Sequence, residues 1–292
     1  MFRRTIIATD LTSAAFAVLK NINILKLYGT EEILLLQCLG QRESDSFALA
    51  YITEALDKNL QEQRRILESQ GFAVETRVVF GVAKKEIDRI AQDEDYSLIV
   101  TGVESCNLLS EPLLGGIGYE IIHYCRTPIL LSRLKETRKD GISYFEPIRE
   151  KYMEHILFPT DFSETANAAF HVIKEMVAVG VKKVTLMHVQ EQNRIDPYLL
   201  SQLNEFNIKD EARLEEMKAA LQEIADVEVN TELFYGSPAR DILEVIESRG
   251  VQLVVMGSQG RGFVKELFLG SVSHNIARHA KASVLLIPAI RT

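Results

Sequence analysis

Residues 157–161 read LFPTD, and they repeat a pattern that the chain has already used at residues 6–10, IIATD. The offset between the two copies is 151 residues at this point and 155 residues further along, where LIVTG at residues 98–102 lies over LVVMG at residues 253–257. A repeat that spans half the chain is far too long for the unit of a solenoid. It predicts a duplicated domain.

The length of the chain agrees with two domains. It has 292 residues, and single domains most often have about 100 to 150. The repeat predicts a first domain over residues 1–133 and a second over residues 154–292. Between them, residues 134–153 mix charged residues with one glycine and one proline and show no clean period. Such a composition is typical of a linker.

Within each half, short apolar runs alternate with stretches of helical spacing, which indicates a parallel sheet covered by helices on both faces. In the second half we expect strands at residues 155–159, 183–188, 228–235, 253–256 and 283–287. We expect helices there at residues 166–179, 199–224 and 239–248. Each half is therefore predicted to be an open α/β sandwich with a mostly parallel five-stranded sheet. Such sheets bind ligands beyond the carboxyl ends of their strands.

Charge and composition exclude several classes of protein. The net charge is −8, from 33 Lys and Arg against 41 Asp and Glu, whereas proteins that bind nucleic acid or a membrane surface need a basic face. No apolar run approaches the roughly 18 residues of a membrane span, and the first run is interrupted at Asp10, too soon for a secretory signal. The cysteines, Cys38, Cys106 and Cys125, form no C-x-x-C pair, which argues against disulfides and structural zinc. We expect a cytoplasmic protein.

A glycine-rich loop follows the predicted strand that ends at Met256. The spacing G-x2-G-x9-G-S is carried by Gly257, Gly260, Gly270 and Ser271. Glycines allow close backbone approach, and Ser271 and Ser273 add hydroxyl groups to the unpaired N–H groups of a helix start, a combination that suits phosphate. A plain glycine-rich turn with a serine N-cap fits the same residues. The spacing matches neither a P-loop nor a dinucleotide fingerprint, which disfavours P-loop NTPases and Rossmann dehydrogenases.

These features together closely resemble the universal stress protein family in its tandem two-domain form. The resemblance is carried by LFPTDFS at residues 157–163, His188-Val189, Gly236-Ser237-Pro238 and the glycine loop, and it covers both halves. It implies a Rossmann-like fold and a stress-response protein that binds ATP, or AMP or ADP, with Mg²⁺, mainly in the second domain. The nucleotide-binding residues that it implies are Pro159, Thr160, Asp161, Val189, Met256, Gly257, Gly260, Gly270, Ser271, Val272 and Ser273.

Three polar residues near this site have alternative roles. Asp161 and Ser163 can both cap the helix that follows the first strand. We favour the ligand role for Asp161 and leave the role of Ser163 open. Arg261 lies inside the loop, where it can pair with a phosphate or remain simply solvated, and we include it among the candidate residues.

The first half departs from the nucleotide-binding pattern. Ser105 replaces the second loop glycine, and Gly116 and Gly118 replace the two serines. Glu104 and Glu111 also place negative charge where phosphates would lie, and like charges repel. We therefore expect the first domain to be empty or to hold a nucleotide with fewer phosphates.

The sequence favours a regulatory nucleotide-binding protein over an enzyme. It has no P-loop lysine and no carboxylate–histidine pair beside the loop. No histidines have metal-ligand spacing, so His188 and the others are expected to be structural. A slow ATPase and a nucleotide-independent interaction scaffold remain alternatives.

The last strand of each half is expected to serve assembly. We expect the two domains to pair through residues 129–132 and 284–288 within one chain, because open apolar edge strands invite aggregation. Relatives with a single domain dimerise through this strand, which points the same way. Whole chains can also form a homodimer.

Overall fold

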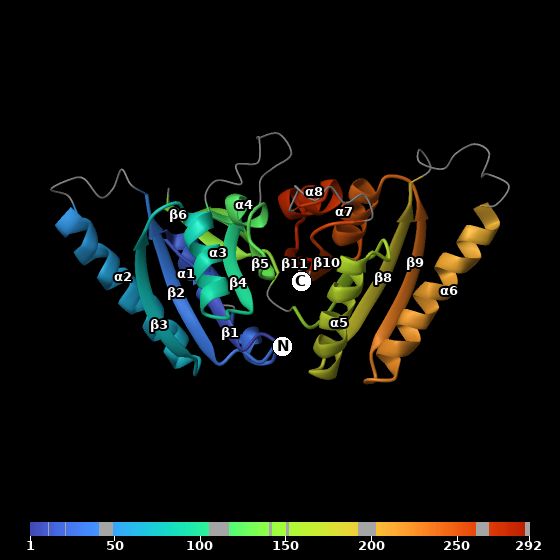
Figure 1. Cartoon of the computed structure of the whole chain (residues 1–292), viewed down its shortest axis with the longest axis horizontal. Helices are drawn as coiled ribbons and strands as arrows, with labels where there is room; N and C mark the ends of the chain where they lie inside the picture. The colour runs from blue at the N-terminus through green and yellow to red at the C-terminus, as the bar shows by residue number, and fades with distance from the viewer. Residues whose placement is uncertain are drawn as a thin grey trace. The chain divides into compact units, whose positions relative to one another are not determined.

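The computed structural model describes residues 1–10, 12–20, 22–40, 49–104, 117–139, 142–149, 152–191, 203–260 and 269–289. The chain divides into two compact units, Met1–Glu150 (unit 1) and Lys151–Thr292 (unit 2). Each unit has its own sheet with helices packed against it (Figure 1). The predicted fold class, two α/β units built on mostly parallel sheets, is confirmed.

Unit 2 contains a five-stranded parallel sheet in the order β9-β8-β7-β10-β11. Its strands are β7 (Ile156–Pro159), β8 (Lys183–Gln190), β9 (Glu228–Tyr235), β10 (Leu253–Gly257) and β11 (Ser283–Ile287). Its helices are α5 (Glu164–Ala178), α6 (Leu203–Gln222), α7 (Pro238–Ser248) and α8 (Ser271–His279). Most of these bounds lie within two residues of those predicted from the sequence. Right-handed crossovers put α5 and α6 on one face and α7 and α8 on the other.

Unit 1 repeats this order as β3-β2-β1-β4-β5. Its strands are β1 (Arg4–Ala8), β2 (Glu32–Leu39), β3 (Ala73–Phe80), β4 (Leu98–Glu104) and β5 (Ile129–Lys139), with β6 (Ile142–Pro147) added antiparallel to β5. Its helices are α1 (Ser13–Lys20), α2 (Leu49–Ser69), α3 (Ala83–Asp93) and α4 (Ile117–Ile122), with a 3-10 turn at Asn23–Lys26.

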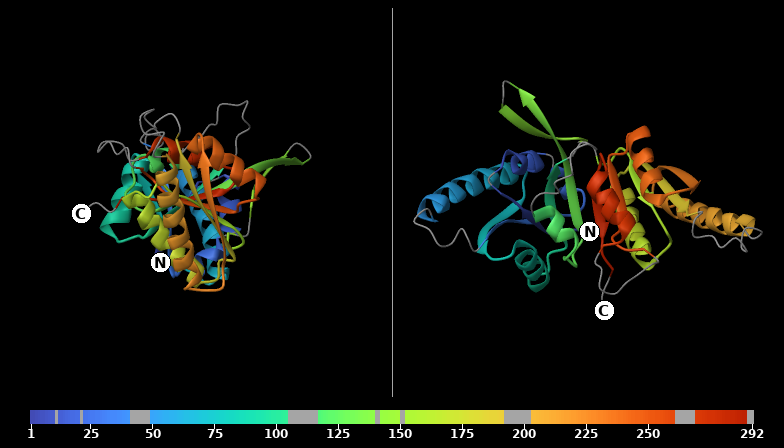
Figure 2. Two further views of the ribbon diagram at one scale, coloured as in Figure 1. Left: turned by 90° about the vertical axis from the view of Figure 1, so that its right-hand side faces the viewer. Right: turned by 90° about the horizontal axis from the view of Figure 1, so that it is seen from above.

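The segment that the sequence suggested as a linker, residues 134–153, contains regular structure. It carries the end of β5 and all of β6, which pair from Leu134 and Pro147 to Lys139 and Ile142. Leu134 is fully buried, whereas the amine of Lys135 lies 3.5 Å from Glu146 on the exposed face. The far end of this hairpin projects away from the body of unit 1 (Figure 2). Lys135, Glu136 and Arg138 are all exposed at this end of β5, where successive residues face opposite sides of the strand, and these charges account for the linker-like composition.

The central strands of unit 2 bring the candidate loops together. Every residue of β7 and β10 is buried, as expected for parallel strands with both faces covered. The two strands are direct neighbours, with Ile156 opposite Leu253 and Leu157 opposite Val254. Their carboxyl ends therefore deliver the turn after Pro159 and the loop after Gly257 to the same edge of the sheet.

Candidate functional site

The turn after β7 is fixed by hydrogen bonds along its own length. The N–H of Thr160 donates to the carbonyl oxygen of Met187 on β8 at 2.8 Å. The N–H of Phe162 donates to Thr160 Oγ1 at 3.0 Å, and that of Ser163 donates to Asp161 Oδ1 at 3.1 Å. Phe162 has a φ of +58°, an uncommon conformation for a bulky residue that persists only where surrounding contacts enforce it. The Asp161 side chain is thus anchored at the end of β7.

Ser163 caps the helix α5, whereas the Asp161 side chain faces the glycine loop. Ser163 is the N-cap of α5, and its hydroxyl accepts a hydrogen bond from the N–H of Ala166 at 3.3 Å. The second carboxylate oxygen of Asp161 faces the glycine loop, because a Cβ atom added to Gly260 would lie 2.5 Å from Asp161 Oδ2. Only glycine fits at that position without displacing the carboxylate.

The glycine loop is packed against the start of α5 through Thr165, a residue that the sequence analysis missed. Thr165 Oγ1 donates to the carbonyl oxygen of Gln259 at 2.5 Å. A Cβ atom on Gly257 would lie 2.7 Å from the same hydroxyl. At the offset of the repeat, unit 1 has Ala14 in place of Thr165. A residue-by-residue comparison of the two halves is the signal that could have found it.

The first turn of α8 closes the other side of the loop. The N–H of Gly270, the N-cap of this helix, donates to the carbonyl oxygen of Ser258 at 2.7 Å. Gly270 provides no side-chain cap, and the first N–H groups of a helix have no intrahelical acceptor. Ser271 is exposed there, but the buried hydroxyl of Ser273 donates to the carbonyl oxygen of Gly257 at 2.9 Å. The proton of the Ser273 hydroxyl is therefore engaged by the loop backbone in this structure, whereas the sequence pattern predicted it as a donor to phosphate.

The described candidate residues lie at one edge of unit 2, at the carboxyl ends of β7, β8 and β10 and in the first turn of α8. Gly260 contacts Asp161, and Gly270 lies beside Gly260. Val189 is half-buried near the end of β8, opposite Phe234 of β9. The remaining candidates in this group are Pro159, Thr160, Met256, Gly257, Ser271, Val272 and Ser273. Arg261 lies outside the described residues, as do Ser105, Glu111 and Gly116 of unit 1.

A second side chain that the sequence left as structural, His188 of β8, reaches the same turn. Its Nδ1 atom lies 2.7 Å from the carbonyl oxygen of Thr160, and its ring packs on Phe162 with 4.8 Å between ring centroids. The carbonyl of Thr160 belongs to the peptide group that joins Thr160 to Asp161. His188 therefore contacts the backbone that carries the candidate carboxylate.

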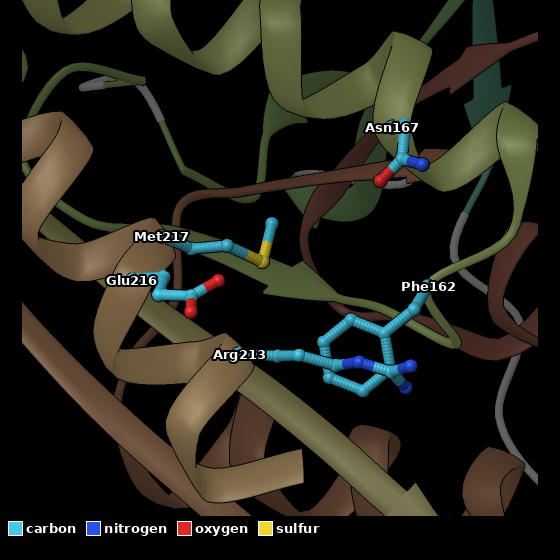
Figure 3. Close-up of a pocket in the computed structure, with 5 residues that line it drawn as sticks. All are labelled: Phe162, Asn167, Arg213, Glu216 and Met217. Carbon is cyan, nitrogen blue, oxygen red and sulfur yellow. The ribbon is translucent and has the colours of Figure 1, made fainter. Parts of the chain in front are cut away.

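Next to this turn lies a cavity of about 570 Å³, lined by residues of α5 and α6 together with Phe162. Its lining residues are Phe162, Asn167, Arg213, Glu216 and Met217 (Figure 3). The guanidinium carbon of Arg213 lies 5.2 Å from the centroid of the Phe162 ring. Among the described residues, the lining includes Phe162, which directly follows Asp161 in the chain.

Unit 1 closes the equivalent turn in a different way. The N–H of Thr9 donates to the carbonyl oxygen of Leu36 at 3.0 Å, as Thr160 does in unit 2. A buried side chain of α2, Gln63, accepts from Thr9 Oγ1 at 2.5 Å and donates to the carbonyl oxygen of Asp10 at 3.1 Å. The Asp10 carboxylate accepts from the N–H and the hydroxyl of Thr12. The turn of unit 1 is thus completed by neutral side chains.

Three further findings concern metal binding, the cysteine thiols and membrane spans. Among the residues that the structure describes, no group of three or more His, Cys, Asp or Glu side chains could hold a metal ion. Burial raises the pKa of the Cys38 thiol to about 12, and it also raises the pKa of Cys125. Both thiols therefore stay protonated, and poorly nucleophilic, at neutral pH. No helix in the described part of the chain is long and apolar enough to cross a membrane.

Both halves of the chain match one known protein family. The model of the universal stress protein family matches residues 1–133 and again residues 153–288. The chain belongs to the universal stress protein family. The two matches confirm the tandem form that the internal repeat predicted.

Members of this family with similar sequences come from archaea and bacteria. A universal stress protein of Methanocaldococcus jannaschii is 30% identical over 151 residues, which cover 45% of this chain and 93% of that protein. One from Mycolicibacterium smegmatis is 28% identical over 224 residues, covering 75% of this chain and 70% of that protein. The crystal structure of a universal stress protein from Archaeoglobus fulgidus is 24% identical with a TM-score of 0.68, over 97% of this chain and 95% of that one. This structural similarity shows the shared fold.

Proposed function

We propose that this universal stress protein is a stress-response regulator that binds an adenine nucleotide, ATP with Mg²⁺, at the carboxyl edge of the unit 2 sheet. The observation that carries the proposal is the contact between Gly260 and the Asp161 carboxylate beside the uncapped first turn of α8. This arrangement puts a hydrogen-bond acceptor next to a cluster of backbone N–H groups. A nucleoside and its phosphates need those two partners side by side.

The residues present fit such a ligand. A Cβ atom on Gly270 would meet neighbouring protein atoms at ordinary contact distances of 3.5–3.6 Å, so the described protein atoms do not themselves require a glycine at this point. The N–H groups at the start of α8 and the positive end of its dipole favour phosphate. Asp161 would accept hydrogen bonds from the nucleoside, and Val189, Met256 and Gly257 would border it. Mg²⁺ would arrive bound to the phosphate oxygens, its preferred ligands. AMP and ADP fit the same adenosine end.

For unit 1 we propose an empty site, or one that holds a nucleotide with fewer phosphates. Gln63 already occupies the hydrogen-bonding groups of Thr9 and the Asp10 carbonyl, and Asp10 Oδ1 is engaged by Thr12. In unit 1 a side chain of the chain itself, Gln63, therefore takes up hydrogen-bonding groups at the place where a nucleotide would have to bind. A nucleotide there would also have to approach a chain that carries Glu104 at the end of β4.

We propose regulation rather than catalysis as the purpose of binding. Phosphoryl transfer to water needs a group that orients or deprotonates the attacking water. Within the described part of the loop, residues 257–260 and 269–273, the sequence GSQG…LGSVS contains no carboxylate, histidine or lysine that could deprotonate this water. We accordingly propose a cytoplasmic regulatory protein that signals through whether a nucleotide is bound, rather than through a reaction of that nucleotide.

The test is calorimetric titration of the full chain with Mg-ATP. We expect one binding site per chain, loss of binding in Asp161→Ala, and unchanged binding in the matched variant Asp10→Ala. Mass spectrometry of the small molecules that co-purify with the chain would identify the nucleotide directly. Retention of binding in Asp161→Ala together with its loss in Asp10→Ala would overturn the assignment to unit 2, and absence of any binding would overturn the proposal.

A further inference from the structure

The side chain of His188 lies between two hydrogen-bond acceptors. Nδ1 is 2.7 Å from the carbonyl oxygen of Thr160, and Nε2 is 3.6 Å from Asp210 Oδ2 of α6. Asp210 is buried. Its Oδ2 atom also accepts a hydrogen bond from Nε2 of Gln190 at 2.9 Å, and its Oδ1 atom accepts one from Nη1 of Arg213 at 3.2 Å. The imidazole thus bridges β7 and α6 from its position on β8.

The chemistry of these two partners decides the protonation of the ring. A backbone carbonyl only accepts hydrogen bonds, so the 2.7 Å contact requires a proton on Nδ1. A carboxylate also only accepts, so a neutral ring with its proton on Nδ1 would turn a lone pair toward Asp210. The doubly protonated ring donates to the carbonyl from Nδ1 and forms an ion pair with Asp210 across 3.6 Å, whereas a neutral ring makes only the first of these interactions.

We propose that His188 is a positioning residue for the nucleotide site of unit 2, held as an imidazolium between the Thr160 carbonyl and Asp210, so that nucleotide affinity falls when the ring loses its proton. The inference rests on the proposed function. The imidazolium fixes the Thr160–Asp161 peptide group, which presents the Asp161 carboxylate to Gly260. The strained Phe162, whose ring covers the imidazole, follows directly in the chain.

The charged groups around the imidazole support the protonated form. From α6, Asp210 faces Nε2, while Arg213 pairs with the other oxygen of Asp210 and lies over the Phe162 ring (Figure 3). Arg213 is about half exposed, with 52% of its side chain accessible, whereas the side chain of Asp210 is 13% accessible. Water therefore screens the cation more strongly than the carboxylate. On β8, Gln190 carries no charge and donates its side-chain amide to the same oxygen of Asp210 that faces His188.

Unit 1 provides an internal comparison, because it lacks a titratable group at this place. At the offset of 151 residues, Gln37 stands where unit 2 has His188. The turn of unit 1 is instead held by the amide of Gln63, which keeps the same charge at every physiological pH. Replacing His188 with the residue of unit 1, His188→Gln, therefore removes the titration and keeps a hydrogen-bond donor.

The first experiment needs no nucleotide. In the full chain, the ¹⁵N signals of the His188 ring and the backbone amide signals of Asp161 and Phe162 are followed as the pH is raised. We expect both ring nitrogens to be protonated at neutral pH, the amide signals to follow the same midpoint, and Asp210→Asn to move that midpoint to lower pH. A singly protonated ring at neutral pH, or amide signals that ignore the ring, would overturn the inference even if nucleotide binds.

The second experiment measures Mg-ATP affinity from about pH 5.5 to 8.5, where histidine titrates. We expect the wild-type affinity to fall about tenfold across this range, the size of one charge-assisted hydrogen bond. The affinity of His188→Gln should not change with pH. In Asp210→Asn the fall in affinity should be centred at a lower pH than in the wild type. His155→Gln, a buried histidine of the same unit, is the matched control and should follow the wild type. Identical profiles for wild type and His188→Gln would refute the inference, whereas absence of binding in every variant would refute the proposed function instead.

Discussion

Three glycines of the unit 2 loop, Gly257, Gly260 and Gly270, have different neighbours in the structure. A Cβ atom on Gly257 would lie within 2.9 Å of Thr165, and one on Gly260 within 2.5 Å of Asp161. Real Cβ atoms do not make such close contacts. Gly270 has a φ of −72°, and a Cβ atom there would meet protein atoms at ordinary distances of 3.5–3.6 Å. The described protein atoms tolerate a Cβ atom at Gly270, so the proposed nucleotide is the group that a side chain there would meet.

Gly270→Val should therefore separate binding from folding. We expect Mg-ATP affinity to fall by more than tenfold, because the new side chain fills the space beside the first turn of α8, while the melting temperature stays within a few degrees of the wild type. Calorimetry and circular dichroism measure the two quantities. Gly257→Ala is the counterpart, and it should lose stability because its Cβ atom collides with Thr165. Undiminished affinity in a folded Gly270→Val variant would contradict the prediction.

The two serine N-caps of unit 2 predict unequal effects of the same substitution. Ser163 accepts a hydrogen bond from the N–H of Ala166, whereas Ser237, the N-cap of α7, makes no side-chain capping bond. Ser163→Ala should lower the free energy of unfolding by about 1 kcal/mol, and Ser237→Ala by much less. Urea denaturation of both variants measures the difference. Equal losses would show that the Ser163 hydroxyl does not stabilise α5.

His155 predicts a loss of stability in acid. Burial, with a smaller contribution from Lys183, lowers the pKa of His155 below its ordinary 6.5, and its Nε2 lies 2.9 Å from Thr185 Oγ1. The unfolded chain therefore takes up this proton more readily than the folded chain. The contribution of His155 is complete above about pH 6.5 and is lost as the pH falls below that value. His155→Gln should flatten the acid side of the profile, whereas His171→Gln, at an exposed position, should not.

Residue contacts that are local in the chain could be predicted from the sequence, and distant ones could not. Asp161, the glycine loop and the capping role of Ser163 depend on a few consecutive residues. The bond from Thr165 to Gln259 joins residues 94 positions apart, and that from Gln63 to Thr9 joins residues 54 apart. Such pairs are set by how helices lie on the sheet, which no short pattern encodes.

At the scale of elements, the β5–β6 hairpin is where sequence and structure differ most. The dipeptide Asp140-Gly141 stands between the two strands, and Asp-Gly between two β-type runs is a strong signal for a hairpin. The exposed charges at Lys135, Glu136 and Arg138 lie on both faces of this end of β5, and they hid the alternation that is typical of a strand. The helices and strands of unit 2 were predictable since their fully buried strands contrast sharply with amphipathic helices.

Leu134→Ala tests whether the start of this hairpin is part of the unit 1 core. Leu134 is fully buried beside Gly102 of β4, and truncating a buried leucine costs about 2 to 5 kcal/mol. We expect a loss of that size in the free energy of unfolding of unit 1. Lys135→Ala, one residue along and half exposed, should change it little. A negligible effect of Leu134→Ala would restore the linker interpretation.

For the whole molecule, the pairing of the two units through their last strands remains a prediction. In unit 2, β11 pairs with β10 through one edge, and in a parallel sheet alternate residues bond to opposite neighbours. If the second edge of β11 is also paired, every amide from Val284 to Ile287 should be protected from hydrogen exchange. The outer strand β9, whose neighbour within unit 2 is β8, should show protection at alternate residues. Alternation in β11 as well would contradict the prediction.

The amide of Gln63 has a consequence for how the two halves diverged after duplication. In unit 1 a side chain of the chain itself completes the first turn, so that turn keeps its shape with nothing bound. A protein segment that is stable without its ligand is released from selection for the residues that hold the ligand. The glycine-to-serine and serine-to-glycine replacements at positions 105, 116 and 118 are changes that such release permits. In unit 2, Met217 of α6 lines an open cavity beside the turn, and the ring of His188, rather than a neutral amide, contacts the turn.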